Sequence, residues 1–589
     1  MAMGDFMKKK IFIDNSTKIP LIWKIILLLE ILIWIPLLFI GFDSHHDGLI
    51  LTTVNMIHDS IRDRGEWPFN QYGPFWAIPF VLFTYFLPNA LVFTTLRIVT
   101  VCFYLLTGFL IYHCAKVIST TRIAFFSLLL FFLSQPFVTD FGSDLVPWPS
   151  AVIMPMFMLV VLLFLRMSVE TETIRQVKYY SYISGFLVSG IFFSRAQIGF
   201  LIFLAFIFML LLKRQIICAT LFVFGFVSLT LILFFVLNYF GWLTDAINDE
   251  FIFGSLYLRG DTSTYPNPVF TLIGTTIFIM LLIFGKKFFV FVTTEYSLKR
   301  VISFFFGFLI FIFMACFIFL NSRSIDSLAI LATIFRRFWI SYYLAVIIFS
   351  VFMQLRKTYH SYKFNQPKHV SLYTRNGLVL FSLVGELQLY PLFDQMHFWW
   401  GSVPAVILTV VVTKETLIDG TVSLNLKNKI INVFLLTATL LSLIQMTGQL
   451  SKLYARFPQD ITKYLWVSPS VSTEQVKLQE FFSNNIPVGS SILNLCANSD
   501  IFFSERNISS STRIFVLWPN ITEIASMKQS LISKKPDLVL TCSLSRIPSL
   551  QNNSELVQRE ILNKLLDNPQ VFAILESSPN MIWRLWKKE

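Results

Sequence analysis

Long apolar runs separated by short polar loops make up most of the chain up to about residue 450. A helix needs roughly 20 apolar residues to cross the hydrocarbon core of a bilayer, so runs of about this length predict transmembrane helices. About thirteen such spans are expected on this criterion. They lie near residues 19–41, 96–116, 121–138, 147–166, 180–193, 197–212, 216–239, 268–284, 300–320, 337–354, 372–390, 403–416 and 429–449.

The pattern changes after about residue 450, where short strand-like apolar runs alternate with helix-like stretches. The strand-like runs lie near 491–495, 513–517, 537–541 and 572–575, and the helix-like stretches near 473–484, 522–533 and 554–566. Strands that alternate with helices predict a small α/β domain, and it contains no glycine-rich phosphate loop. The expected division is an N-terminal segment 1–18, a membrane domain 19–450 and a soluble domain 451–589.

The composition excludes an ordinary soluble protein. Hydrophobic residues make up 55% of the chain and charged residues only 14%, about half the charged share of a globular domain. The net charge of +13 would suggest nucleic acid in a soluble protein. Here much of the excess lies in short loops between apolar runs, so membrane lipids are expected as partners and nucleic acid is not.

The basic loops also predict the orientation. Lys8, Lys9 and Lys10 precede the first span, and short loops rich in Lys and Arg stay in the cytoplasm. The N-terminus is therefore expected inside and the C-terminal domain outside. The segment near 76–92 must then be re-entrant or interfacial, because a full crossing would reverse every later loop.

The runs 180–193 and 197–212 are short for spanning helices and are separated by Ser194-Arg195-Ala196-Gln197. They are interpreted as paired half-length helices that meet at a polar tip. Irregular backbone at such a tip is tolerated where it is buried in protein or lines a wet cavity, which indicates a cavity open to the outer side. Arg195 itself is equally well explained as a residue that binds phosphate or as an ordinary charged residue at a helix end.

Candidate chemistry lies in the outer loops, above all in the loop 42–75. Asp43, His45, His46 and Asp47 stand within five residues at the exit of the first span. Such a cluster can accept a proton from a hydroxyl group or bind a divalent ion. The alternative is a hydrated loop in which Asp47 caps the amphipathic helix predicted over 49–64.

Another outer segment combines Asp394 and His397 with Trp399 and Trp400 at a membrane boundary. The tryptophans are typical of an interfacial aromatic belt. The third outer loop, 239–268, holds further acids among aromatic residues. Cys496 and Cys542 share the soluble domain, and a disulfide between them is left open.

The order of these motifs resembles the type C (GT-C) glycosyltransferase superfamily, which includes protein O-mannosyltransferases and aminoarabinose transferases. The resemblance rests on Asp43-Ser44-His45-His46-Asp47-Gly48, Gln71-Tyr72-Gly73-Pro74, the helix pair around Arg195, and Tyr390-Pro391 with Asp394 and His397. It covers the chain up to about residue 450. Asp47 is followed by Gly48 rather than by a second acid, which is a departure from better-known members.

The resemblance implies a bacterial cell-membrane enzyme that moves a sugar from a polyprenyl-phosphate donor to a glycan, lipid or protein acceptor on the outer face, with inversion. Asp47 would be the base, assisted by Asp43 and His46, and Arg195 would meet the leaving phosphate. Tyr72, Asp394 and His397 would shape the donor and acceptor sites. Whether a divalent ion such as Mg²⁺ or Mn²⁺ takes part is left open; Asp43 and Asp47 are its candidate ligands.

Two other classes compete with this hypothesis. A flippase or transporter of polyprenyl-linked glycans predicts ionisable residues deep within the spans and often an internal repeat. A polysaccharide polymerase or ligase would use similar lipid-linked substrates but is expected to carry a large outer loop between late helices. Here the large soluble part is terminal.

Overall fold

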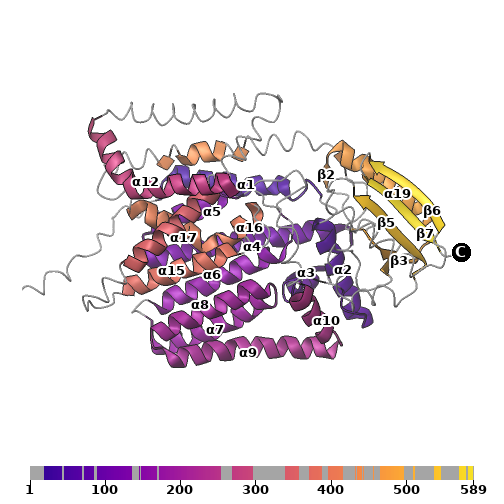
Figure 1. Cartoon of the computed structure of the whole chain (residues 1–589), viewed down its shortest axis with the longest axis horizontal. Coiled ribbons are helices and arrows are strands. Elements are labelled where there is room, and N and C mark those ends of the chain that lie inside the picture. Colours follow the sequence, from indigo (N-terminus) through magenta and orange to yellow (C-terminus); the bar gives the residue numbers. More distant parts are fainter. Residues whose placement is uncertain are drawn as a thin grey trace, which may run out of the picture.

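The computed structural model is a bundle of long helices with a small sheet domain at one end (Figure 1). The description covers 19–42, 46–68, 70, 72–84, 89–135, 145, 147–168, 172–253, 268–295, 339–356, 370–387, 395–415, 431–432, 434–440, 442–443, 455–456, 465–496, 509–510, 536–544, 570–578 and 581–587. By this architecture the chain is a polytopic α-helical membrane protein with a small C-terminal sheet domain, as predicted.

The long helices fall where the apolar runs predict them. They are α1 (Leu21–Leu37), α4 (Asn89–Ile118), α5 (Thr121–Leu133), α6 (Pro149–Met167), α7 (Ile174–Phe192), α8 (Ala196–Leu212), α9 (Ile216–Tyr239), α12 (Pro268–Glu295), Trp339–Arg356, α15 (Val370–Glu386) and α17 (Val403–Thr413). Among the described residues, four helices are long and apolar enough to cross a membrane by length and composition: Leu91–Ile118, Pro149–Met167, Ile216–Tyr239 and Trp339–Arg356. The run near 300–320 lies outside the described residues.

The amphipathic helix α2 and shorter helices gather at the end of the bundle that faces the sheet (Figure 1). They include α2 (His46–Asp63), α3 (Ala77–Thr84) and α10 (Leu243–Ile247), which is followed by a π-helical turn, η1 (Asn248–Phe253). Eight residues of helix span only about 12 Å, so α3 cannot cross a bilayer by itself. That the segment near 76–92 is re-entrant or interfacial stays a prediction, because residues 85–88 lie outside the described residues.

The prediction of two half-length helices is half wrong. The first helix, α7, begins at Ile174 and has 19 residues, because its polar first turns continue the helix beyond the apolar run. A capping box formed by Thr173 and Gln176 starts it. The predicted break between the two helices is confirmed, since Phe193, Ser194 and Arg195 form the turn that leads into α8.

Two glycines allow α7 and α9 to pack with their backbones in contact. A Cβ atom at Gly185 would collide with the carbonyl oxygen of Phe222, and one at Gly225 would collide with that of Tyr182. Small residues at helix crossings are typical of membrane bundles, where close van der Waals packing replaces the hydrophobic effect as the force between helices.

The C-terminal domain contains a mixed five-stranded sheet. Its strands are β3 (Ser491–Asn494), β4 (Ser509–Ser510), β5 (Leu538–Leu544), β6 (Gln570–Ser578) and β7 (Met581–Lys587), in the order β4-β3-β5-β7-β6. Strands β3, β4 and β5 are parallel, whereas β7 is antiparallel to both of its neighbours. Helix α19 (Pro469–Asn485) buries Leu478 and Phe482 against the sheet, and Cys496 is buried in the same cluster. The side chain of Cys542 lies outside the described residues, so the disulfide stays an open prediction.

The soluble domain is joined to the bundle by backbone hydrogen bonds. The short strand β2 (Trp466–Val467) lies beside the end of the first helix, where Gly41 N donates to Trp466 O (2.8 Å) and Trp466 N donates to Phe39 O (2.7 Å). Leu465, Val467 and Leu493 belong to the same buried cluster as the bundle core. The sheet domain is thus docked directly on the C-terminal end of α1.

The close crossing of α7 and α9 is tested by a substitution at Gly185. Gly185→Val forces the two backbones apart, and overpacking of this kind costs about 1–3 kcal/mol. We expect a lower melting temperature for the purified variant in detergent. Val223→Ile adds one carbon at a position of α9 that is 38% exposed, and it is expected to melt like the wild type. Equal melting temperatures for Gly185→Val and the wild type would contradict the crossing.

Candidate functional site

The predicted base, Asp47, lies in a buried ion pair. It stands in the first turn of α2, and its Oδ2 accepts a hydrogen bond from Arg97 Nη2 at 3.0 Å. Both side chains are 0% exposed. Arg97 comes from α4 and was not singled out in the sequence, although a lone charge inside an apolar run is itself a signal of function or of pairing.

Arg97 also holds the backbone that precedes α2. Its Nη1 donates to Ile40 O (2.8 Å), its Nη2 donates to Gly41 O (2.9 Å), and its guanidinium lies 4.5 Å from the centre of the Phe93 ring. These carbonyls stand beyond the last turn of α1, where no helical partner is available to them. One side chain therefore connects the end of α1, the start of α2 and the body of α4.

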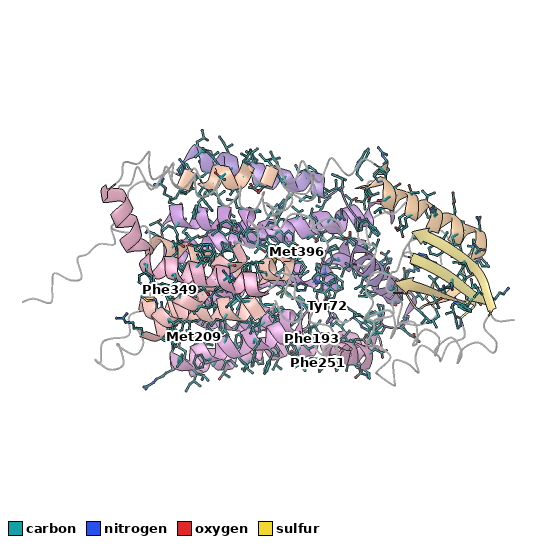
Figure 2. The ribbon with its side chains drawn as sticks, turned by 45° about the horizontal axis from the view of Figure 1, so that its top comes forward. Tyr72, Phe193, Met209, Phe251, Phe349 and Met396 are labelled. Atoms are coloured by element: carbon teal, nitrogen blue, oxygen red, sulfur yellow. The ribbon has the colours of Figure 1, made fainter. Side chains whose placement is uncertain are left out.

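A second polar group forms around the corner between α7 and α8, where Arg195 and Tyr72 lie close together. Both are expected from the sequence to bind substrate or phosphate, and that role stays a prediction. Arg195 is only 9% exposed, and its Nη1 donates to Ser150 Oγ (3.1 Å) in the first turn of α6. Its guanidinium carbon lies 6.0 Å from the centre of the Tyr72 ring. Tyr72 in turn packs edge-on against Trp148 at 5.3 Å. Figure 2 shows Tyr72, Phe193 and Phe251 toward the end of the bundle that faces the sheet.

The predicted motif Tyr72-Gly73-Pro74 packs closely against the turn between α7 and α8. Phe75 N donates to Phe193 O (2.9 Å), and a Cβ atom at Gly73 would collide with that same carbonyl group. Only glycine allows the loop to lie this close to the α7–α8 turn. The motif therefore sets the position of Tyr72 beside Arg195.

Glu250, on η1, also lies at the corner between α7 and α8. The sequence does not distinguish it from the other acids of its loop. Its carboxylate accepts the backbone N–H of Ala196 at the start of α8, and its Oε2 would lie 2.6 Å from a Cβ atom at Gly73. Glu250 is 5% exposed. Burial removes water from the charged form and raises the pKa of Glu250 well above its ordinary value.

Neighbouring contacts attach the same loop to η1 and α10. Asn70 N donates to Asp249 Oδ2 (3.3 Å), and Tyr72 N donates to Asn70 Oδ1 (3.1 Å). Trp242, which precedes α10, donates from Nε1 to Gly65 O (2.8 Å). The first and third predicted outer loops, far apart in the sequence, thus form one structure.

The other predicted residues are described only in part. His397 lies on α16 (Gln395–Gly401), is 7% exposed and packs edge-on against Trp400 at 5.2 Å. Trp400 Nε1 donates to Tyr104 on α4, so the aromatic residues are buried in the bundle rather than placed in an interfacial belt. Asp43, Asp394 and the side chain of His46 lie outside the described residues.

The described residues do not fit a divalent ion. Among them no three His, Cys, Asp or Glu side chains are placed to hold a metal. The carboxylate of Asp47 already faces a guanidinium group, whose charge opposes that of an added cation.

No family model matches the chain, and no curated protein matches it. Solved structures do. The oligosaccharyltransferase AglB from Archaeoglobus fulgidus, in complex with an inhibitory peptide and a dolichol-phosphate, is 12% identical with a TM-score of 0.44, over 88% of this chain and 69% of that chain. ArnT from Cupriavidus metallidurans bound to undecaprenyl phosphate is 12% identical with a TM-score of 0.40, over 96% and 97%.

The Archaeoglobus enzyme tethered with an acceptor peptide that contains the NVT sequon gives a TM-score of 0.46 at 12% identity, over 95% of this chain and 74% of that chain. At this identity and these TM-scores, nothing that those proteins bind or catalyse is assigned to this chain on the basis of the similarity.

The buried ion pair gives a stability prediction. Arg97→Met leaves Asp47 as an uncompensated buried charge, which costs about 3–5 kcal/mol, whereas Arg97→Met combined with Asp47→Leu is expected to regain part of that loss. Thermal unfolding of the two variants and the wild type measures the difference. Arg62→Gln breaks an exposed pair with Asp63 on the same α2 helix and is expected to change little. A double variant no more stable than Arg97→Met would contradict the pairing energy.

Glu250 gives a prediction about pH. Because its pKa is raised in the fold, the protonated carboxyl group stabilises the native state, and this stability is lost as pH rises from about 4.5 through the raised pKa. Glu250→Gln stays neutral, so its melting temperature is expected to fall less than that of the wild type over the same pH range. Glu66→Gln, at an exposed position of the same outer end, serves as the control. Parallel curves for Glu250→Gln and the wild type would refute the buried protonated acid.

Proposed function

We propose that the chain is an integral membrane glycosyltransferase that moves a sugar from a polyprenyl-phosphate donor to an acceptor on the outer face of a bacterial cell membrane. The acceptor is a glycan, a lipid or a protein. In the proposed orientation the N-terminus is cytoplasmic, and the bundle end that carries α2, the α7–α8 corner and the sheet domain is extracytoplasmic.

The observation that carries this proposal is the buried Arg195 beside Tyr72 and Trp148 at the outer end of the bundle. A guanidinium group presents five N–H donors in a planar fork, so Arg195 can hold Ser150 and a phosphate oxygen together. A donor whose chain lies in the membrane brings its phosphate to this level. A charge fixed in a desolvated place stabilises the negative charge that develops on the leaving phosphate.

Aromatic rings next to Arg195 supply the surface for the sugar. Tyr72 and Trp148 are held edge to face, and the Gly73 contact fixes the loop that carries Tyr72. A sugar ring presents apolar C–H faces that pack on aromatic rings. His397, buried against Trp400, and Asp394 are proposed to shape the acceptor side.

Asp47 is proposed as the base. The acceptor hydroxyl oxygen attacks the anomeric carbon, the bond from that carbon to the phosphate oxygen breaks, polyprenyl phosphate leaves, and the hydroxyl proton passes to Asp47. Arg97 pairs with the carboxylate and fixes one of its oxygen atoms. Asp43 and His46, its neighbours in sequence, are proposed to assist it. In-line attack from the face opposite the phosphate inverts the anomeric configuration.

A flippase is the second candidate function. Two carboxylates are buried on long helices of the bundle, Glu30 on α1 and Glu386 on α15, and an ionisable residue inside a membrane is a signal of transport. Ser402 donates to Glu386 Oε1 (3.1 Å), which provides a local partner for that acid.

Transfer of labelled sugar from a panel of polyprenyl-phosphate monosaccharides tests the proposal, with purified protein in lipid. We expect Arg195→Gln to lower the transfer rate by about 10²–10³-fold, as the loss of one charge-stabilising donor does. Asp47→Asn, which keeps an acceptor for Arg97, is expected to lower it by at least about 10²-fold. The outer-loop variant Arg62→Gln is the control of equal charge change.

Binding of the donor is measured on the same variants, so that loss of chemistry is separated from loss of fold. Suppose that the wild type binds a donor or moves it across the bilayer without cleavage, and that Asp47→Asn behaves identically. The proposed transferase activity is then wrong, and the flippase function replaces it. If only Asp47→Asn is unaffected while Arg195→Gln is inactive, the transferase stands and Asp47 is not its base.

A further inference from the structure

A cavity of about 730 Å³ lies at the end of the bundle opposite the sheet domain. Its walls are the end of α6, the start of α7 and the turn between α8 and α9. Figure 2 shows Met209, which precedes this turn on α8, toward that end, away from Tyr72 and Phe193. The volume falls within the roughly 300–1,000 Å³ typical of small-ligand sites. This cavity is separate from the candidate transferase site.

Three cations line the cavity against a single acid. Lys178, Lys213 and Arg214 stand opposite Glu172, so three positive charges and one negative charge leave a net +2. Among the described residues no carboxylate forms an ion pair with any of the three. Lys213 contacts neutral groups: Met167 O (3.4 Å), Ser168 Oγ (3.2 Å) and the ring of Tyr373. The charge of this cavity is therefore not neutralised by its own walls.

The backbone adds to the positive potential. Helix α9 begins at the cavity without a side-chain cap, and the first amides of a helix attract anions. Arg214, two residues before α9, has a φ of 57°, the left-handed region that glycine usually occupies after a helix. An arginine at this position bears a conformational cost that a glycine would not.

Exposed apolar side chains border the cations. Ile174, Ile216 and Ile217 line the cavity and are 78%, 68% and 62% exposed. A free phosphate ion gains nothing from such a border. A membrane lipid places its phosphate among the cations and its acyl chains along the isoleucines, so the border favours a lipid over a soluble anion.

We infer that this cavity is a binding site for the phosphate headgroup of an anionic membrane lipid. Lys213 and Arg214 hold the phosphate from the α8–α9 turn, Lys178 holds it from α7, and the exposed isoleucines contact the acyl chains. Glu172 limits the affinity through its opposing charge. By the proposed orientation the site lies at the cytoplasmic leaflet, and it does not depend on the proposed transferase activity.

Binding of phosphatidylglycerol to the purified full-length protein, compared with phosphatidylcholine, tests the site by native mass spectrometry. We expect Arg214→Gly to weaken phosphatidylglycerol binding on the order of tenfold. Because glycine suits the backbone at this position, the variant is expected to melt no lower than the wild type, so its loss of binding is not a loss of fold. Lys213→Gln is expected to weaken binding to a similar extent.

Two further variants separate the site from general attraction to a basic surface. Glu172→Gln removes the opposing charge and is expected to strengthen binding severalfold, a gain that misfolding does not produce. Arg175→Gln changes an exposed cation of α7 outside the cavity and is expected to leave the affinity unchanged. An equal loss in Arg175→Gln and Arg214→Gly would overturn the site, as would equal affinity of the wild type for the two lipids.

A competition experiment with inorganic phosphate distinguishes a lipid headgroup from a soluble phosphate compound. Competition of inorganic phosphate with phosphatidylglycerol supports recognition of the phosphate group itself. If inorganic phosphate binds in a manner that depends on Lys213 while phosphatidylglycerol does not bind, the inference of a lipid ligand is wrong. The ligand is then a soluble phosphate compound.

Discussion

The buried charge of Arg97 is the constraint on which the end of the bundle beside the sheet domain depends. A guanidinium group inside an apolar bundle must be neutralised and its N–H groups must be bonded, because either omission costs several kcal/mol. Asp47 supplies the charge, and the carbonyl groups of Ile40 and Gly41 accept two of the hydrogen bonds. To satisfy one side chain, the chain has to bring α1, α2 and α4 to the same point.

The same point carries the soluble domain. Gly41, whose carbonyl group Arg97 binds, donates its own N–H to Trp466 of β2. The backbone that leaves α1 is therefore held from within by a charged side chain and from outside by a strand. This arrangement connects the docking of the sheet domain to the position of Asp47, the residue proposed to act as the base.

The two ends of the bundle differ in how their charged side chains are paired. At the outer end, Arg97 is neutralised by Asp47, and Arg195 lies among aromatic rings near the acidic turn η1. At the opposite end, Lys178, Lys213 and Arg214 form no ion pair with a carboxylate among the described residues, and Glu172 opposes them as the acid that lines the same cavity. The paired charges of Arg97 and Asp47 hold helices together. The unpaired cations of the cavity are the ones proposed to bind an anionic ligand.

The sequence by itself determined the class of the protein, the positions of most helices and the order of its outer motifs, because apolar runs of membrane length and strand-helix alternation are local patterns. It also predicted that Tyr72 and Arg195 belong to one site. It did not show that Asp47 pairs with Arg97, that Glu250 reaches Gly73, or that α7 extends back to Ile174. The first two are contacts between residues that are 50 or more positions apart, and only the tertiary structure decides them, because burial and hydrogen bonding across helices depend on packing that no local pattern encodes. The start of α7 is a local feature, a capping box of Thr173 and Gln176, which the apolar run alone does not mark.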